Sequence, residues 1–342
     1  MEDEYIEDSD MLDVLDKQIV HALTADARIP FARLGAILDI SEQTAARRYR
    51  SLRRRGMIHV SGQVNSVPLG HTKWLLRIRS TPSRAPVLAE TLARVPDLSW
   101  VSLLSTGYEV FCTGRPRSAE RRDELLLRLI PRVSDVLELS VHESMRQFPL
   151  ADEWPRYGRL LSARQLSELG PRPSLWEPSG PESPVTLSRE DGIMLTILGR
   201  DGRAPYAQIS AATGWSATRV ARRMSELVES GVLYFDLDFA MGAMGYNARA
   251  LLWMRVRPGD LEKVGLTIAA YSEVAFLSAI SGPANLFASV ACRDTAHLYR
   301  FVTERLGSLE GIGDVEVTPA LRTYKQSQTL LDVHRPGVVP SL

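Results

Sequence analysis

The chain has 342 residues, of which 44% are hydrophobic and 24% charged, and its 41 basic residues are balanced by 41 acidic ones. This length suits two or more domains, and the composition is ordinary for a soluble globular protein. No apolar run is long enough to span a membrane and no secretion signal opens the sequence, so we expect a cytoplasmic protein without a membrane partner.

Three short helices are predicted at the start of the chain. Apolar residues recur at helical spacing in the first, at Leu12, Leu15, Ile19 and Leu23. The second begins near Pro30, a residue suited to the first turn of a helix. Ser41 is a good N-cap for the third helix, and Gly56 is suited to end it.

The third helix concentrates positive charge. Residues 41–56 hold six arginines and one glutamate in a chain that is neutral overall. Ala45, Tyr49 and Leu52 share one apolar face, which leaves the other face to the arginines. Three short helices, the third of them basic, match a helix-turn-helix unit. Residues 57–67 alternate enough to follow it as a short wing or strand.

The elements that come next predict a βαββαβ order. The expected strands and helices are, in turn, residues 73–80, 84–95, 98–106, 108–114, 118–130 and 136–145. The order returns late in the chain at residues 248–257, 259–271, 273–281, 284–292, 295–306 and 313–322. Helices cover one face of such a sheet, so its open face needs a partner.

The two halves are joined by a proline-rich segment. Six prolines lie between Pro155 and Pro184. This composition predicts an extended tether, with a short helix near Ser162–Leu169. A tether of this length allows the two halves to pack on each other.

The sequence also contains an internal repeat. A shift of 175 residues aligns the two helix-turn-helix segments without a gap. The matching pairs include Leu12 and Leu187, Asp16 and Asp191, Asp26 and Asp201, Arg28 and Arg203, Ser41 and Ser216, Arg47 and Arg222, Arg48 and Arg223, Leu52 and Leu227, and Gly56 and Gly231. The helix-turn-helix unit is therefore predicted to occur twice.

Both copies resemble the Lrp/AsnC (leucine-responsive, feast/famine) transcriptional regulators. The first copy carries the pattern as LDVLDKQIVHALTADAR followed by SEQTAARRYRSLRRRGMI, and the second as LSREDGIMLTILGRDGR followed by SATRVARRMSELVESGVL. The resemblance implies an α+β fold of two tandem units, each a winged helix-turn-helix followed by a ferredoxin-like βαββαβ domain for effector binding and assembly. It also implies self-association, as an intrachain pseudo-dimer and as a homo-oligomer.

These expectations divide the chain into six segments. They are a first helix-turn-helix domain (10–66), a first ferredoxin-like domain (67–149), the linker (150–185), a second helix-turn-helix domain (186–241), a second ferredoxin-like domain (242–325) and a tail (326–342).

Double-stranded DNA is the expected partner, because a basic helix fits the major groove and its phosphates. The N-terminal half of the third helix is expected to reach base edges with Gln43, Thr44 and Arg47, and in the second copy with Thr218, Arg219 and Arg222. Phosphate contacts are expected from Arg48, Arg54, Arg55 and Arg223. The alternative for Arg48 and Arg223 is local pairing with acids such as Asp26 and Asp201.

The family's glycine turn between the second and third strands of the ferredoxin-like domain reads T-G-x-x-D. Here the corresponding residues are Thr106, Gly107, Tyr108 and Glu109 in the first copy, and Ser281, Gly282, Pro283, Ala284 and Asn285 in the second. The resemblance implies a pocket for a small amino-acid-like effector near these turns. The alternative is that they are ordinary β-turns in which glycine supplies the backbone angles.

An enzyme is the competing hypothesis, because siroheme decarboxylases resemble the family in fold. Their histidine-containing motif has no counterpart in residues 98–111 or 274–287, and the six histidines are scattered. No catalytic or metal-binding motif is present, so we expect no enzyme, cofactor or metal. Cys112 and Cys292 are expected to be buried as small hydrophobic residues. Arginines in both third helices disfavour a purely structural protein that has lost DNA binding.

Overall fold

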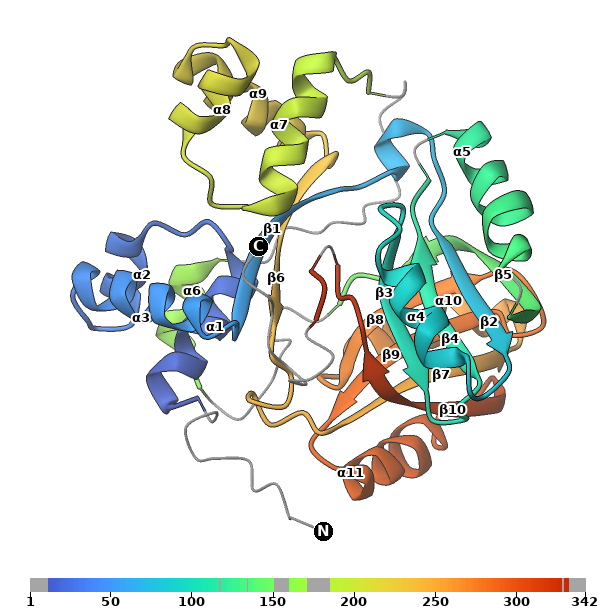
Figure 1. Cartoon of the computed structure of the whole chain (residues 1–342). Helices are drawn as coiled ribbons and strands as arrows, with labels where there is room; N and C mark the ends of the chain where they lie inside the picture. Colours follow the sequence, from blue (N-terminus) through green and yellow to red (C-terminus); the bar gives the residue numbers. More distant parts are fainter. Residues whose placement is uncertain are drawn as a thin grey trace.

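Each half of the chain opens with three packed helices (Figure 1). The computed structural model describes residues 12–116, 118–133, 135–150, 160–170, 185–327 and 329–331. The first unit consists of α1 (Val14–Ala25), α2 (Phe31–Ile37) and α3 (Glu42–Arg54), and the second of α7 (Arg189–Arg200), α8 (Tyr206–Thr213) and α9 (Ala217–Glu229). Ser41 and Ser216 cap α3 and α9 as predicted. Pro30 occupies the N-cap of α2 and not its first turn.

A two-stranded antiparallel ribbon joins the two units. β1 (Ile58–Val64) follows the first unit, β6 (Leu233–Phe239) follows the second, and they pair with each other from Ile58 opposite Phe239 to Val64 opposite Leu233. The strand predicted after each helix-turn-helix is present, but its hydrogen-bond partner belongs to the other unit. Glycine is needed where the ribbon meets α7, because a Cβ at Gly62 would lie 2.8 Å from the Cβ of Leu198.

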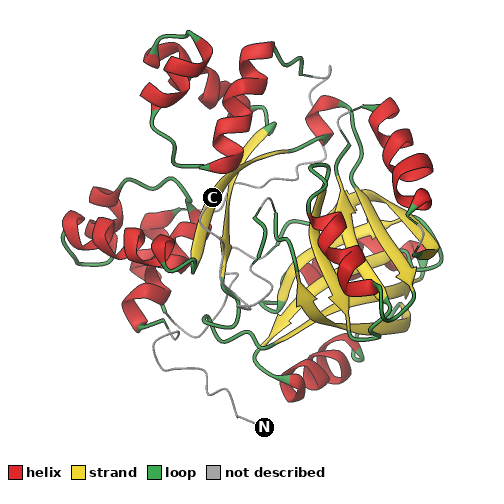
Figure 2. Cartoon of the chain, viewed as in Figure 1, coloured by secondary structure: helices red, strands yellow, loops and turns green. Residues whose placement is uncertain are grey.

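The two βαββαβ segments form an eight-stranded barrel with its helices outside (Figure 2). The first contributes β2 (Trp74–Ser80), α4 (Ala85–Ala93), β3 (Leu98–Leu104), β4 (Glu109–Gly114), α5 (Ala119–Asp123) with its π-helical extension Glu124–Leu129, and β5 (Val136–Gln147). The second contributes β7 (Ala248–Val256), α10 (Leu261–Ala269), β8 (Val274–Ile280), β9 (Leu286–Cys292), α11 (Thr295–Arg300) with its π-helical extension Phe301–Leu306, and β10 (Ile312–Thr323).

The barrel shows how the open sheet faces are covered. Its strand order is β10-β3-β4-β2-β5-β8-β9-β7, so each half is a ferredoxin-like sheet and the two sheets join at the β10–β3 and β5–β8 edges. Both open faces line one interior, which is filled by Leu75, Leu104, Phe111, Leu251, Trp253, Ile280 and Phe287. The Phe111 and Phe287 rings stack with their centroids 5.1 Å apart. The predicted fold class is confirmed, and each sheet edge is protected as well as each face.

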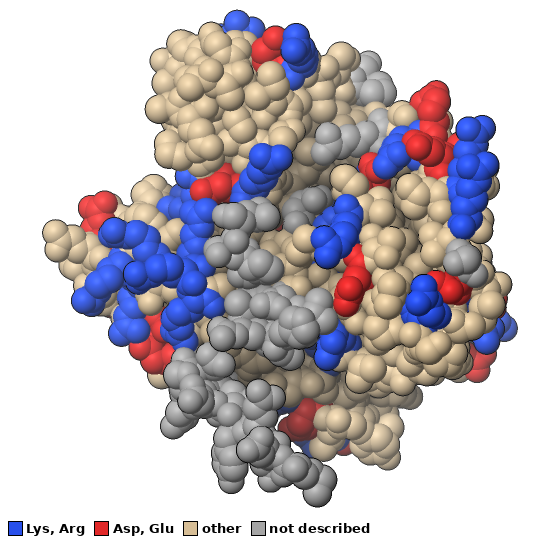
Figure 3. All heavy atoms as spheres, viewed as in Figure 1, with Lys and Arg blue, Asp and Glu red and all other residues tan. Residues whose placement is uncertain are grey.

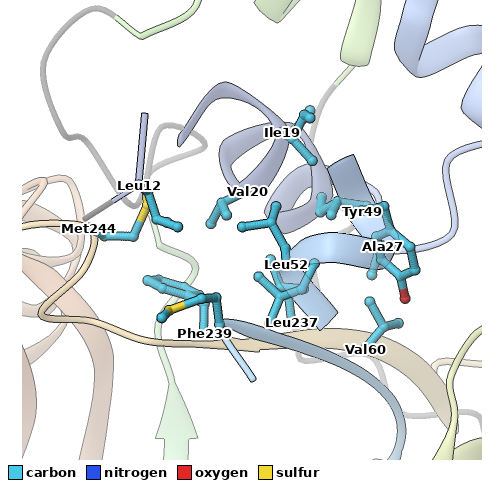
Figure 4. Packing of buried hydrophobic residues seen from close by; sticks show 14 of the residues in the cluster. Leu12, Ile19, Val20, Ala27, Tyr49, Leu52, Val60, Leu237, Phe239 and Met244 are labelled. Atoms are coloured by element: carbon cyan, nitrogen blue, oxygen red, sulfur yellow. The ribbon is translucent and has the colours of Figure 1, made fainter. Parts of the chain in front are cut away.

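The core of the first helix-turn-helix unit includes residues from the second half of the chain. Leu237 and Phe239 of β6, and Met244 just beyond it, pack with Leu12 and Leu52 (Figure 4). The ribbon carries each strand onto the other unit, so the hydrophobic core extends across the segment limits expected from the sequence. Both cysteines are free and buried, as predicted.

Part of the expected tether is a docked helix. α6 (Ala163–Leu169) begins with a capping box at Ser162, and Gln165 donates a hydrogen bond to the Ile37 carbonyl oxygen of α2 at 2.9 Å. Leu169 is buried in the core of the first unit. The remaining residues predicted to be extended, 151–159 and 171–184, lie outside the described residues. Within the described ranges, no helix has the length and apolar character required to cross a membrane.

Candidate nucleic-acid interface and effector pocket

The outward face of α3 carries three of its predicted DNA-binding residues. Ala45, Tyr49 and Leu52 are buried against the unit, which leaves Gln43, Arg47 and Arg54 exposed. Arg47 and Arg54 make no ion pair with any described residue. Thr44 is half-buried at the helix start, where its backbone N–H donates to the Ser41 hydroxyl oxygen at 3.1 Å.

Arg48 and Arg55, two predicted phosphate contacts, are half-buried and lie beside acidic side chains. Arg48 lies 2.6 Å from an Asp13 oxygen and 3.2 Å from an Asp16 oxygen, and Arg55 lies 3.8 Å from Asp16. These acids belong to the N-terminal turn of α1, whose first N–H groups attract negative charge. The proposed local pairing of Arg48 is therefore present, but its partners are Asp13 and Asp16 and not Asp26.

The second unit repeats this arrangement. Arg223 binds Asp191 through two hydrogen bonds of 2.8 Å, and Asp191 is almost fully buried. Arg223 also lies 3.1 Å from Glu226, so the side chain expected at a phosphate is committed to two carboxylates. Its partner is Asp191 and not Asp201. The Asp–Arg pair occurs in both units. It anchors α3 to α1 in the first unit and α9 to α7 in the second, and we call α3 and α9 the reading helices.

The outward face of α9 is less basic than that of α3. Thr218, Arg219 and Arg222 are exposed, as expected for groove-facing residues. Arg222 lies 3.5 Å from Glu226, however, and the Arg219 guanidinium stacks over the Trp215 ring at 4.5 Å. Both arginines thus have neighbours that restrain or partly neutralise them.

Arg50 is a candidate that the sequence pattern did not single out. It is exposed on α3, and its Nε donates to the Ala46 carbonyl oxygen of the preceding turn. Its position three residues after Arg47 places both on the same side of the helix. Figure 3 shows basic side chains gathered on the first unit, whereas the face of the second unit in the same view carries few.

Two equivalent arginines hold the units together. Arg28 donates to the Gly202 carbonyl oxygen of the second unit, and Arg203 donates to the Ala27 and Ile29 carbonyl oxygens of the first at 2.8 and 2.9 Å. Their guanidinium groups also stack on aromatic rings, Arg28 over Phe235 at 5.0 Å and Arg203 over Phe31 at 4.6 Å. The Asp-x-Arg segments of the repeat therefore form an interface related by an approximate two-fold axis.

Arg53 adds an ion pair across this interface. Its guanidinium lies 2.9 Å from Asp201 of the second unit. This contact has no equivalent, because the matching residue of α9 is Val228. Arg53 therefore helps to hold the two units together.

A pocket of about 420 Å³, which we call the turn-side pocket, lies beside the two glycine turns. Tyr108 and Glu109 of the first turn and Pro283 and Ala284 of the second all line it. The structure thus brings together four of the nine predicted effector residues, two from each half of the chain. The remaining lining residues are Arg77, Arg79, Glu138, Ser140, His142, Trp253 and Glu316.

Charged groups in the turn-side pocket neutralise one another. Glu109 is buried and binds Arg77 through two hydrogen bonds of 2.9 and 3.1 Å, and Arg77 also binds Glu316 of the second half. Burial opposes a charged Arg77, but the two carboxylates outweigh it and raise its pKa. The hydrogen bond from Arg77 lowers the pKa of Glu316. This network links the two halves across the pocket.

The other five turn residues do not line the turn-side pocket. Thr106 is exposed and Gly107 has a φ of 76°, so these two form a turn at the surface. The Ser281 hydroxyl oxygen accepts from the backbone N–H of Glu143, and the Asn285 side-chain amide both donates to and accepts from the backbone of Val256. These contacts hold the second turn in place, as the β-turn alternative predicts.

His142 is a pocket residue that its sequence context did not reveal. It lies on β5, and its Nδ1 is 2.7 Å from the Ser281 carbonyl oxygen. A Cβ at Gly282 would lie 2.6 Å from the same nitrogen, so the turn needs glycine here. The Trp253 ring contacts His142 with centroids 5.1 Å apart. Only the pairing of β5 with β8 brings this histidine to the turn.

Comparison with known proteins gives matches in both halves. The family model for the AsnC-type helix-turn-helix domain matches residues 12–53 and again residues 191–228. The model for the Lrp/AsnC ligand binding domain matches residues 249–330. The chain belongs to the Lrp/AsnC family. It is a double-length member, because the helix-turn-helix domain occurs twice.

Curated relatives are about half as long as this family member. The HTH-type transcriptional regulator FL11 of Pyrococcus horikoshii is 27% identical over 147 residues, which is 43% of this chain and 97% of that protein. The HTH-type transcriptional regulator LrpA of the same organism is 26% identical over 136 residues, or 40% of this chain and 95% of that one. Each relative therefore corresponds in length to a little less than half of this chain.

A solved structure matches the double-length arrangement. The siroheme decarboxylase NirDL, in complex with an iron-uroporphyrin III analogue, aligns with 92% of this chain and 93% of its own at a TM-score of 0.58. The sequence identity is 15%, so the similarity shows the fold alone. Among the described residues, no group of three or more His, Cys, Asp or Glu side chains is placed to hold a metal ion.

Proposed function

We propose that this Lrp/AsnC family member regulates transcription by binding double-stranded DNA with α3 and α9. The observation that supports this most directly is the outward face of α3, where Arg47 and Arg54 are exposed and form no ion pair with a described acidic residue. An exposed, unpaired arginine releases counterions on reaching a phosphate, while one already bound to a carboxylate gains less. FL11 and LrpA, each similar to about two fifths of this chain, are HTH-type transcriptional regulators.

We further propose that one chain acts as an intrachain pseudo-dimer. The β1–β6 ribbon, the Arg28 and Arg203 contacts and the shared barrel interior support this arrangement. Two reading helices on one rigid body are suited to two half-sites on one DNA duplex. Association of whole chains into larger oligomers is a further proposal, which sedimentation at several protein concentrations would test.

The DNA-binding proposal is tested by genome-wide mapping of bound DNA and by anisotropy titration with the motif that the mapping identifies. We expect specific binding that weakens steeply with added salt. Equal affinity for every sequence at all salt concentrations would contradict a sequence-specific regulator. The enzyme alternative makes a separate prediction, since a purified tetrapyrrole-binding protein would retain a strong visible absorption band. We propose that no such band is present and that the protein is not an enzyme.

We propose that a small amino-acid-like effector binds at the turn-side pocket. The pocket is lined by Arg77 and Arg79 and by Glu109, Glu138 and Glu316. Both arginines are paired with these glutamates, so a zwitterion would bind by exchanging these ion pairs for its own carboxylate and ammonium groups. A thermal-shift screen of the twenty amino acids tests this, with Arg79→Gln as the variant that should lose the response. A response that is unchanged in Arg79→Gln would place the effector elsewhere.

A further inference from the structure

A second cavity lies at the opposite end of the barrel, next to the ribbon. Its volume is about 230 Å³, and β6 contributes Tyr234, Asp236 and Phe239 to its wall. The barrel contributes Thr113 and Leu251 among others, so an occupant would touch the ribbon and the barrel at once. We call this the ribbon-side cavity.

The ribbon-side cavity is distinct from the turn-side pocket. Along β2, alternate side chains face the barrel interior. Lys73, just before the strand, lines the ribbon-side cavity, Leu75 lies in the central cluster and Arg77 lines the turn-side pocket. The packed centre of the barrel therefore separates the two sites.

Positive charge predominates in the ribbon-side cavity. Its described lining residues include Lys73, Arg115 and Arg249, and one acidic residue, Asp236. Burial lowers the pKa of Arg249 to about 10. Burial, reinforced by the nearby charge of Arg115, lowers the pKa of Lys73, and Asp236 only partly offsets this. Several cations in a confined space favour a bound anion, because an anion offsets their desolvation.

In the described part of the chain, the hydrogen-bond partners of the Arg115 and Arg249 side chains are neutral. Arg249 donates to the Thr323 hydroxyl oxygen at 2.7 Å, and Arg115 donates to the Tyr234 hydroxyl oxygen at 2.7 Å. Neither forms an ion pair with any described carboxylate, and the buried Nε of Arg115 has no hydrogen-bond partner among the residues that the structure describes. A guanidinium group has five N–H donors, so both retain donors for a ligand.

The rest of the wall is largely apolar and aromatic. Phe111, Phe276 and Phe287 line it, with the Lys73 ammonium 3.8 Å from the Phe276 ring centroid. Trp100 also lines it and has a φ of 53°, an unfavourable value for a residue with a side chain. Such strain concentrates at ligand sites, where the surrounding fold enforces it. The cavity thus combines an apolar surface with cationic donors.

We propose that the ribbon-side cavity binds a small aromatic carboxylic acid, with its carboxylate at Arg115 and Arg249 and its ring on the phenylalanine wall. About 230 Å³ equals roughly seven or eight water volumes of about 30 Å³, which suits a single-ring molecule. An amino group on that molecule is disfavoured, because its ammonium would add to the charges of Arg115 and Arg249. The site therefore selects against amino acids, in contrast to the turn-side pocket.

Three molecules with the same phenylpropyl body test this selectivity. Isothermal titration calorimetry of the full chain should show binding of 3-phenylpropanoate, with L-phenylalanine and 3-phenylpropan-1-ol each at least about tenfold weaker. Equal binding of the alcohol would mean that the cavity recognises the apolar ring and not the carboxylate. Equal or tighter binding of L-phenylalanine, or no binding of 3-phenylpropanoate at millimolar concentration, would also overturn the proposal.

Single substitutions locate the site. Arg115→Gln and Arg249→Gln, one from each half of the chain, should each weaken 3-phenylpropanoate binding about tenfold or more while the melting transition stays cooperative. Arg122→Gln removes a surface arginine paired with Asp123 and should bind normally. If Arg79→Gln abolishes binding and both cavity variants retain it, the carboxylate occupies the turn-side pocket and the proposal is wrong. The measurement does not involve DNA, so its result tests the ligand proposal separately from the proposed regulatory function.

Discussion

The two helix-turn-helix units share their internal contacts and differ on their outer faces. In each, an arginine of the reading helix binds an aspartate of the first helix, Arg48 with Asp16 and Arg223 with Asp191. Outside these pairs the charges diverge. Arg54 of α3 is matched in the repeat by Glu229 of α9. The comparison teaches that the residues common to both copies position the reading helix, while the residues that contact a target are free to differ.

Separating the units should have the largest effect. A chain ending after residue 150 loses the partners of β3 and β5 at the barrel edges and exposes Leu75, Leu104 and Phe111. Exposed apolar faces and free strand edges associate, so we expect this fragment to dimerise or aggregate. Light scattering measures this directly. A well-behaved monomer would show that the first half does not need the second.

The charge difference predicts unequal contributions to DNA affinity. Arg47→Ala should weaken binding about tenfold, whereas the equivalent Arg222→Ala should have a smaller effect, since Arg222 already lies beside Glu226. Both residues are exposed, so neither change disturbs the core. Anisotropy titrations at several salt concentrations measure both. Equal losses would mean that α3 and α9 contribute equally to DNA affinity.

Conversely, Glu229→Arg should make the contribution of the second unit to DNA affinity more like that of the first. It replaces a repulsive carboxylate by the residue type that stands at the matching position of α3, Arg54. We expect a gain in affinity of several-fold that disappears at high salt, measured in the same titrations. A gain that persists at high salt would indicate a contact other than charge attraction.

The two helices also predict an asymmetric DNA site. Gln43, Thr44 and Arg47 stand opposite Thr218, Arg219 and Arg222 in the repeat, and glutamine pairs well with adenine whereas arginine pairs well with guanine. Replacing residues 42–50 by 217–225 makes the helices alike and should shift selected sites towards an inverted repeat, at about 1–3 kcal/mol per altered base pair. Binding-site selection compares the two proteins. A palindromic site for the unmodified chain would reject pairing of both helices of one chain on one site.

The buried ion pairs should differ in stability and in pH response. Arg223→Ala leaves Asp191 buried without its two hydrogen bonds and should cost about 2 kcal/mol in the second unit. Arg48→Ala should cost less, because Arg48 also binds Asp13, which is half exposed. Thermal denaturation of the two variants gives the comparison. A larger loss for Arg48→Ala would contradict the burial argument.

Acid should affect the two units in opposite directions at these aspartates. Burial raises the pKa of Asp191, but hydrogen bonds from Arg223 and Ser188 outweigh burial and lower the pKa below its ordinary value. Asp191 therefore stabilises the folded state at a pH above its pKa in the unfolded chain. This stabilisation is lost as the pH falls through the lower pKa of the folded state. At Asp16, burial and the neighbouring Asp13 charge raise the pKa above its ordinary value. The protonated Asp16 therefore stabilises the folded state at low pH, and this stabilisation is lost as the pH rises through the pKa of the folded state. Hydrogen exchange between pH 5 and pH 2.5 should show residues 185–230 losing protection before residues 12–56. Asp191→Asn should reduce this difference.

The sequence by itself determined the local elements and their repetition. Apolar residues at helical spacing, the Ser41 and Ser216 caps and the alternating strands depend on neighbours within a few residues, so the helix-turn-helix units and the βαββαβ order could be predicted. The same local signals marked the exposed faces of α3 and α9, because the buried positions of a helix define its outer side.

Only the tertiary structure decided which arginines are available and where the cavities lie. A row of arginines in the sequence does not reveal that Arg48, Arg53 and Arg55 bind acids, since these acids come from α1 and from the other unit. His142 meets the second turn, and Arg115 meets Tyr234, only because strands from the two halves pair and close. Contacts between residues more than a hundred positions apart depend on register and packing, which local residue patterns do not specify.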